Sequence, residues 1–242
     1  MIARSAFRFN EYQAVGFYAN LQLAVRRILP HLLSELADVL DGDPISLPVP
    51  KEAPPEVPRL ILGNKDQSIR MEVSLLRTDV RWQRRTEEHE FTLPQFSDFA
   101  VRAFNRFQEI TQARPGRLAL VVYRFQPHEK PGKALAAHFC LPQLLLDDPG
   151  RKGPLNRPEN FEIHAHKRFQ LAQFLVNSWV RCKTGTIKVG NKRDRIILVE
   201  QDINTLPEVL EETELSDEEI QNFHRLCIDE LETIIRLYFP DA

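Results

Sequence analysis

Two histidines, His164 and His166, have the type and spacing that come nearest to a reactive site in this chain. They fall where apolar and polar residues alternate, a pattern that predicts a β-strand. Residues two apart on a strand project from one face, so the two rings could share a metal ion or act as an acid/base pair. No third ligand is evident, and we favour a polar strand face that is exposed to solvent.

Arginines and lysines are the other side chains that could bind a ligand. They gather on a predicted hairpin in the first half of the chain and around a second hairpin, near Trp179, in the second half. Clustered cations beside an aromatic ring can hold a phosphate backbone and stack a base. The sequence pI near 6.4 argues against a dedicated nucleic-acid binder. The candidate nucleic-acid-binding residues are Lys183, Lys188, Lys192, Arg193, Arg195, Arg81, Arg84 and Arg85.

Two pairs of carboxylates could hold a cation, Asp147 with Asp148 and Glu200 with Asp202. We interpret the first pair as a turn and the second as the polar end of a strand.

The three cysteines, Cys140, Cys182 and Cys227, are odd in number and form no Cys-x-x-Cys motif. This argues against both a disulfide framework and a zinc site. We expect reduced and mostly buried thiols.

Motifs that carry common chemistries are absent. The chain has only nine glycines and contains no GxGxxG, no Gly-Lys-Ser/Thr and no Gly-x-Ser-x-Gly. No lysine follows an acidic residue at the spacing of a PD-(D/E)xK nuclease. We therefore expect no catalytic residue, no cofactor and no metal site. The sequence does not decide whether the protein is an enzyme, and we favour a protein without enzymatic activity.

Length and composition are those of a folded protein. The 242 residues suffice for a sizeable core, and 43% are hydrophobic and 27% charged. The first ten residues lack the apolar core of a secretory signal, and no apolar run is long enough for a membrane span. We expect a cytoplasmic protein.

Charge is segregated along the second half. Residues 150–195 hold eleven Lys/Arg and three Asp/Glu, whereas residues 196–242 hold two Arg and thirteen Asp/Glu. The two stretches can neutralise each other within the fold or across an oligomer, or the basic stretch can face an anionic partner.

The first half is predicted to contain a short N-terminal strand and then one kinked helix or two short helices from about 12 to 41, interrupted by Pro30. A proline-rich connector follows over 43–58. Three strands are predicted around 59–62, 69–75 and 80–82. A long helix follows Thr92-Leu93-Pro94 and ends at Arg114.

The second half is predicted to begin with a strand over 118–125 and an apolar segment over 134–146. Strands are predicted around 161–165 and 196–199. The segment 171–182 fits strand or helix spacing, and we favour strand. A capping box of Ser216 and Glu219 starts the last helix.

The expected fold class is therefore α+β, with two similar halves at 1–114 and 115–242 that form two domains or one continuous domain. Each half reads strand, helix, three strands, helix, with antiparallel-rich sheets and helices packed on one face. The tripeptide Thr-Leu-Pro occurs at 92–94 and again at 205–207, ahead of the late helix of each half. These features suggest an internal duplication, and the sequence does not decide whether the halves join through their sheets or their helices.

Three stretches, residues 54–82, 116–123 and 200–205, resemble a sporadically distributed family of uncharacterised prokaryotic proteins of similar length. The first reads Pro-Pro-Glu-Val-Pro-Arg-Leu-Ile-Leu-Gly and runs through Arg-Thr-Asp-Val-Arg-Trp. The resemblance implies a prokaryotic accessory protein and carries over no reaction or site.

Our leading hypothesis is a non-enzymatic accessory subunit of a multi-component prokaryotic system, which uses sheet edges or a helix face to bind a protein partner or a second copy. The alternative is an RNA- or DNA-binding module that uses the basic hairpin at Lys183–Arg195. The third hypothesis is an atypical nuclease or hydrolase centred on His164 and His166.

Overall fold

The computed structural model describes residues 2–19, 21–50, 52–86, 91–145, 153, 155–189 and 192–241. Within these residues the chain forms four α-helices and a single antiparallel sheet of nine strands. The strands are β1 (Arg8–Phe17), β2 (Ile45–Ser46), β3 (Leu60–Gly63), β4 (Ile69–Val73), β5 (Arg77–Gln83), β6 (Arg117–Pro127), β7 (Glu162–Leu171), β8 (Phe174–Val189) and β9 (Lys192–Thr205). The helices are α1 (Val25–Leu36), α2 (Leu93–Thr111), α3 (Pro131–Phe139) and α4 (Asp217–Tyr238). The α+β class is confirmed.

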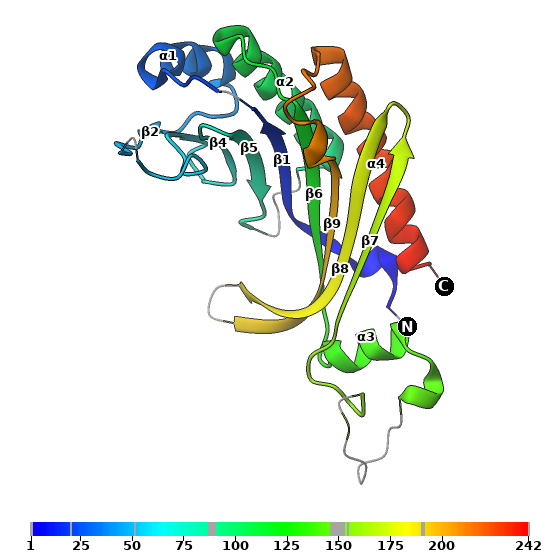
Figure 1. Ribbon diagram of the computed structural model, residues 1–242. Coiled ribbons are helices and arrows are strands. Elements are labelled where there is room, and N and C mark those ends of the chain that lie inside the picture. The colour runs from blue at the N-terminus through cyan, green and yellow to red at the C-terminus, as the bar shows by residue number, and fades with distance from the viewer. Residues whose placement is uncertain are drawn as a thin grey trace.

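The strand order is β2-β3-β4-β5-β1-β6-β9-β8-β7. The first half supplies β1 to β5 and the second half supplies β6 to β9, so the halves meet where β1 pairs with β6. They also meet through α2 and α4, which pack together (Figure 1). The two halves therefore join through both their sheets and their helices.

Helices α1, α2 and α4 lie on one face of the sheet, and the core fills the space between (Figure 1). Alternate strand residues such as Tyr12, Val80 and Trp82 point toward the helices and are fully buried. The α2 stripe supplies Phe96, Phe104 and other aromatic rings. The Tyr12 ring stacks on Trp82 at 4.8 Å and meets Phe96 at 5.3 Å. This aromatic layer confirms the predicted apolar stripe of the helix after Pro94.

Residues 12–19 and 21–24 are not helical, contrary to the prediction. Residues 8–17 form β1, which pairs with β5 on one side and β6 on the other. A strand in the middle of a sheet is buried on both faces, so its apolar residues lose the alternation of a half-exposed strand and mimic a helical spacing. The helix begins only at Val25 and carries Pro30 inside it.

The two Thr-Leu-Pro tripeptides have different roles. Thr92 is the N-cap of α2, and its hydroxyl accepts a hydrogen bond from the Gln95 backbone N–H. Thr205 instead ends β9, and the following residues form the 3₁₀ turn η3 (Pro207–Val209) well before α4. The N-cap of α4 is Ser216, in the predicted capping box with Glu219. The repeated tripeptide therefore marks no equivalent position.

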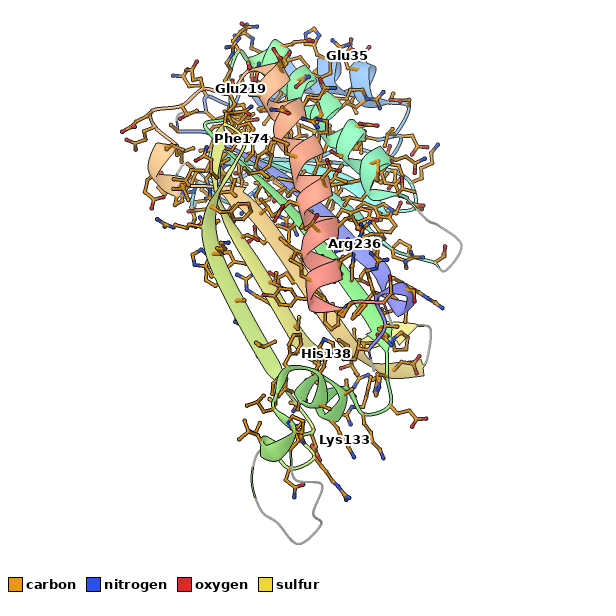
Figure 2. The ribbon with its side chains drawn as sticks, turned by 90° about the vertical axis from the view of Figure 1, so that its right-hand side faces the viewer. Glu35, Lys133, His138, Phe174, Glu219 and Arg236 are labelled. Carbon is orange, nitrogen blue, oxygen red and sulfur yellow. The ribbon has the colours of Figure 1, made fainter. Side chains whose placement is uncertain are left out.

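The remaining elements are close to their predicted places. Segment 171–182 belongs to a long hairpin of β7 and β8 and is strand, as favoured. The apolar segment after residue 130 becomes α3 and the 3₁₀ turn η2 (Pro142–Leu144). His138 of α3 contacts the lower end of α4, where its Nε2 lies 2.7 Å from the Tyr238 carbonyl oxygen (Figure 2). Within the described residues, each helix is too short or too polar to cross a lipid bilayer.

Candidate functional site

The sheet face that points away from the three long helices carries polar and aromatic side chains, and we call it the open face. Directly opposed residues of antiparallel strands project on the same side, so these side chains form rows across the sheet. One row runs from β1 to β7 through Glu11, Tyr123, Glu200, Arg181 and His164. The next row runs through Arg81, Gln13, Val121, Asp202, Trp179 and His166.

The carboxylates of the first two rows lie in a partly desolvated setting. Burial raises the pKa of Glu11, although Arg81 nearby lowers it in part. Burial also raises the pKa of Asp202, whose carboxylate accepts a 2.8 Å hydrogen bond from the Asn204 side-chain amide. Desolvation and the neighbouring Glu200 raise the pKa of Tyr123 to about 12. Burial at the centre of the open face therefore disfavours the charged forms of Glu11 and Asp202.

Three side chains form a stack near β7, which we call the tryptophan stack. The His166 ring lies parallel to Trp179, with centroids 4.1 Å apart, and the Arg181 guanidinium lies 4.9 Å from the Trp179 ring centroid. Arg181 is also ion-paired with Glu200. Aromatic and arginine side chains of this kind are enriched at the energetic centres of protein interfaces.

The two histidines of β7 lie on the same face, as the alternation predicted. His164 Nε2 lies 2.7 Å from Glu162 Oε1, whereas His166 Nε2 lies 3.1 Å from Asn177 Oδ1. The rings thus use separate partners. Across the described chain, no group of three or more His, Cys, Asp or Glu side chains is arranged to hold a metal ion. Asp147 and Asp148 lie outside the described residues.

The first-half candidates for nucleic-acid binding are engaged within the fold. Arg81 pairs with Asp79 at 3.3 Å on the open face. Arg84 Nε donates a 2.7 Å hydrogen bond to the Phe9 carbonyl, and Arg85 Nη2 donates one of 2.9 Å to the Gln67 carbonyl. These arginines tie the end of β5 to neighbouring segments.

The second-half candidates are divided between the two faces of the β8–β9 hairpin. Lys183 stands opposite Leu198 on the open face, while Arg193 and Arg195 lie on the other face according to the register. Arg195 donates a 2.8 Å hydrogen bond to the Glu159 carbonyl. The side chains of Lys188 and Lys192 lie outside the described part of the structure.

Strand β7 forms one border of the sheet, because it pairs only with β8 among the described strands. Figure 2 shows it along the outer margin of the molecule, on the far side of the sheet from β1. Its ten residues are exposed or half-buried throughout. The alternation in the sequence identified this strand, but only the sheet order shows that it lies at an edge.

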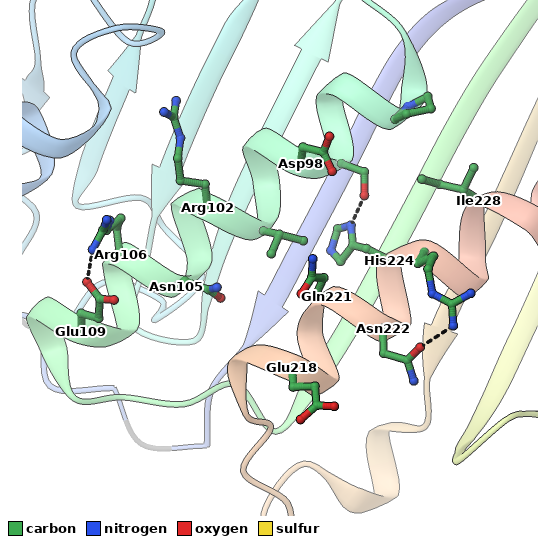
Figure 3. A pocket seen from close by; sticks show the side chains of 14 residues that line it. Asp98, Arg102, Asn105, Arg106, Glu109, Glu218, Gln221, Asn222, His224 and Ile228 are labelled. Atoms are coloured by element: carbon green, nitrogen blue, oxygen red, sulfur yellow. Dashed lines mark hydrogen bonds and ion pairs between the residues drawn. The ribbon is translucent and has the colours of Figure 1, made fainter.

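A groove of about 950 Å³ separates α2 from α4 on the outer side of the helices (Figure 3). Its rim carries charges of both signs, including Asp98, Arg102 and Glu218. At its floor the Ser97 hydroxyl lies 3.0 Å from His224 Nδ1, and both residues are buried. Burial lowers the pKa of His224 to about 4, so the ring is neutral near pH 7. The Ser97–His224 pair therefore links α2 to α4 beneath the groove, and both side chains are largely shielded from solvent.

The cysteines are free thiols, as expected. Cys182 and Cys227 are buried, and burial raises the pKa of Cys182 to about 12. A thiol with a raised pKa is a poor nucleophile. Cys140 is half-buried.

The sequence matches no protein-family model, and no curated protein is significantly similar to it.

Proposed function

We propose that the protein is a non-enzymatic accessory subunit that binds a partner protein along the free edge of β7. The partner would add one extended segment to the sheet as a tenth strand. The observation that carries this proposal is the contrast between the two sheet borders. Strand β2 has two residues and lies in the proline-rich connector, whereas β7 has ten residues and no proline.

Natural proteins shield sheet edges by shortening them or by placing prolines there, because an unpaired strand invites another chain. Border β2 follows this practice, with Pro44 and Pro48 on either side. Border β7 is neither short nor interrupted by proline, and among the described residues its only protection of the known kinds is charge, from Lys167 and Arg168. A long proline-free edge is suited to recognition by strand addition, in which backbone hydrogen bonds supply much of the affinity.

The register shows which backbone groups of β7 face outward. A two-residue turn, Ala172-Gln173, joins Leu171 to Phe174, and the Thr184 N–H donates to the Phe161 carbonyl at 3.2 Å. Hydrogen-bonded and non-hydrogen-bonded pairs alternate along an antiparallel ladder. The even-numbered residues from 162 to 170 therefore direct their N–H and C=O groups away from β8. The close His166–Trp179 stack fits a non-hydrogen-bonded pair.

Proline substitutions test this proposal directly. His164→Pro removes an outward N–H and leaves the β7–β8 ladder bonds in place, and His164→Ala is the matched control for loss of the imidazole. We expect wild-type protein and His164→Ala to capture the same partner from the native host, and His164→Pro to lose it. Ala165→Pro removes a ladder N–H and should lower the thermal stability as well.

Two results would count against the proposal. One is a strict monomer by light scattering that retains no host protein. The other is unchanged capture by His164→Pro.

A second candidate function is nucleic-acid binding by the β8–β9 hairpin. Beyond its pairing with β6 and β7, this hairpin continues as a two-stranded ribbon that curves away from the rest of the sheet (Figure 1). Arg193 and Arg195 are exposed on it. Such binding would weaken steeply with salt and would be lost when Lys188, Lys192 and Arg193 become Glu. The absence of any shift with oligonucleotides at low salt would remove this candidate.

We also propose that the halves arose by internal duplication and that the chain is related to the sporadically distributed prokaryotic family. The support for the family is the resemblance of residues 54–82, 116–123 and 200–205, and the support for the duplication is the element order. Apart from β2, each half runs strand, helix, three strands, helix, and the strand order β3-β4-β5-β1 is mirrored by β6-β9-β8-β7. Superposition of residues 8–111 on 117–238 tests the duplication, and a failure to align the four strands and the second helix would reject it.

A further inference from the structure

We propose that the segment accepted by β7 is an extended peptide in which acidic and apolar residues alternate. This inference rests on the proposed function and specifies the chemistry of the partner. It is carried by the side chains on the two faces of β7, which an added strand would meet one by one.

On the open face, the middle of β7 presents His164, His166 and Arg168 at successive same-face positions. An added residue directly opposite each of them lies within side-chain contact distance. Arg168 attracts a carboxylate in that position, and His164 and His166 do so when they are protonated. Glu162 and Gln170 flank this strip at its two ends. The strip therefore favours carboxylates at every second residue of the partner.

The strip is held in place by neighbouring groups. Arg168 Nε donates a 3.1 Å hydrogen bond to Asn177 Oδ1, and its Nη2 lies 3.1 Å from Glu208 Oε1 of η3. His166 is fixed by the tryptophan stack and by Asn177. Side chains that are already ordered lose less conformational entropy when a partner binds. Arg168 and Glu208 are both about half-exposed, so this ion pair is weak and leaves the guanidinium able to receive a second carboxylate.

On the face toward the helices, β7 presents Ile163, Ala165, Phe169 and Leu171, which are half-buried. An added strand would place its alternate residues beside them and extend the apolar layer. Lys167 interrupts this row and is exposed, with its ammonium 5.8 Å from the Phe169 ring centroid. The partner should therefore be apolar on this face, with one polar residue near Lys167.

A second copy of this chain fits the strip less well. In a β7–β7 pair, the open-face row of the partner copy contains a single carboxylate, Glu162, for the three basic positions. An acidic segment of another protein can supply a carboxylate to each.

Synthetic peptides provide the test. Two labelled ten-residue peptides share the same apolar positions and carry Glu or Lys at the alternate positions, and a third has the Glu residues in scrambled order. Fluorescence anisotropy against the full-length protein should show the alternating Glu peptide binding at least about tenfold more tightly than the Lys peptide. The scrambled peptide should bind more weakly than the alternating one. Higher salt should weaken the binding of the Glu peptide, because salt screens the attraction between opposite charges.

Variants separate this inference from the proposed function. His164→Pro should abolish binding of the Glu peptide, and Arg168→Glu should reverse the preference between Glu and Lys. If the Glu and Lys peptides bind equally well and both lose binding to His164→Pro, the inference of an acidic partner is wrong and the proposal of strand addition stands. Glu-peptide binding that survives His164→Pro would overturn both, and binding of none of the peptides would overturn the acidic partner.

Hydrogen exchange on the wild-type protein gives a readout that no variant can confound. The Glu peptide should slow exchange at the His164, His166 and Arg168 amides, whose N–H groups face outward. Unchanged exchange at these amides in the bound protein would overturn the inference. A dimer whose formation depends on the same amides would overturn it in favour of a second copy.

Discussion

His224 is an imidazole that the fold buries between α2 and α4, and its titration should control stability in mild acid. Among the described residues, its Nε2 atom has no hydrogen-bond partner, while Nδ1 contacts the Ser97 hydroxyl. Burial lowers the pKa from 6.5 to about 4. Between these values the unfolded chain binds a proton that the folded chain does not, so the free energy of unfolding falls as the pH falls.

We expect this histidine to account for a loss of roughly 2 kcal/mol of unfolding free energy between pH 7 and pH 5. The measurement is urea unfolding at both pH values, for the wild type and for His224→Phe. The variant should lose less stability on acidification than the wild type does. His31→Gln supplies the control, because it removes an imidazole from an exposed position instead of a buried one. An identical pH dependence in His224→Phe and wild type would contradict the prediction.

The residues of the candidate site could be predicted only in part. Alternation in the sequence is enough to place His164 and His166 on one strand face, because strand side chains have a period of two. The stack of His166 on Trp179 depends on the β7–β8 register, which the two-residue turn at Ala172 fixes and the composition does not reveal. The candidate nucleic-acid-binding residues were chosen because they are all basic. Their hydrogen bonds to backbone carbonyls, and their placement on opposite faces of the β8–β9 hairpin, depend on tertiary contacts that the sequence pattern does not show.

At the scale of elements, one partly buried ion pair connects α4 to the middle of the sheet. Arg124 of β6 is buried, lies over the Phe9 ring, and bonds to Gln201 of β9 and Glu232 of α4. Burial lowers the pKa of Arg124, and the nearby Glu232 carboxylate raises it in part. Removing one partner of such a pair leaves a charge with poor solvation.

A double-mutant cycle should reveal this coupling. Glu232→Gln should lower the free energy of unfolding by about 1–2 kcal/mol in the wild type and by much less in an Arg124→Met background. Chemical unfolding of the four proteins gives the coupling energy. The same cycle on the exposed pair Arg106–Glu109 of α2 should show no measurable coupling. Equal effects of Glu232→Gln in both backgrounds would show that the pair does not connect the elements.

Elements with strong local signals were predicted well, and those that depend on their neighbours were not. The start of α4 can be predicted from its capping box, because that motif involves only residues 216–219. A short N-terminal strand was predicted, but β1 from Tyr12 onward was mistaken for helix, because its apolar residues are set by β5, β6 and α2, all distant in sequence. The strand content of 171–182 and the hairpin at Lys183–Arg195 are both confirmed, but the continuity of a single strand from Phe174 to Val189 was not predicted.

At the scale of the whole molecule, the halves form one continuous sheet whose order no local pattern dictates. The pairing of β1 with β6 follows from the burial of both strands, yet several buried strands were available as partners. The charge segregation of the second half is partly resolved within the chain, since Arg168 pairs with Glu208 and Arg181 with Glu200. The long edge at β7, which is unpaired among the described residues, is a property of the assembled sheet, and the proposed partner site depends on it.

The connection between the halves should be the place where the molecule tolerates least change. Gly116 begins the second half, and its N–H donates a 2.9 Å hydrogen bond to the Phe17 carbonyl at the end of β1. A methyl group there would overlap the Leu210 carbonyl and lie 2.6 Å from the Thr213 carbonyl oxygen, both in the acidic connector. Because backbone atoms cannot rotate away, Gly116→Ala should cost about 3 kcal/mol and lower the Tm by roughly 6–12 °C. Gly153→Ala is the matched control, since no atom of the described residues lies within 4 Å of the added methyl group, and its Tm should stay the same or rise slightly. Calorimetry that finds equal Tm values for the two variants would show that the connector is not held against the junction of the halves.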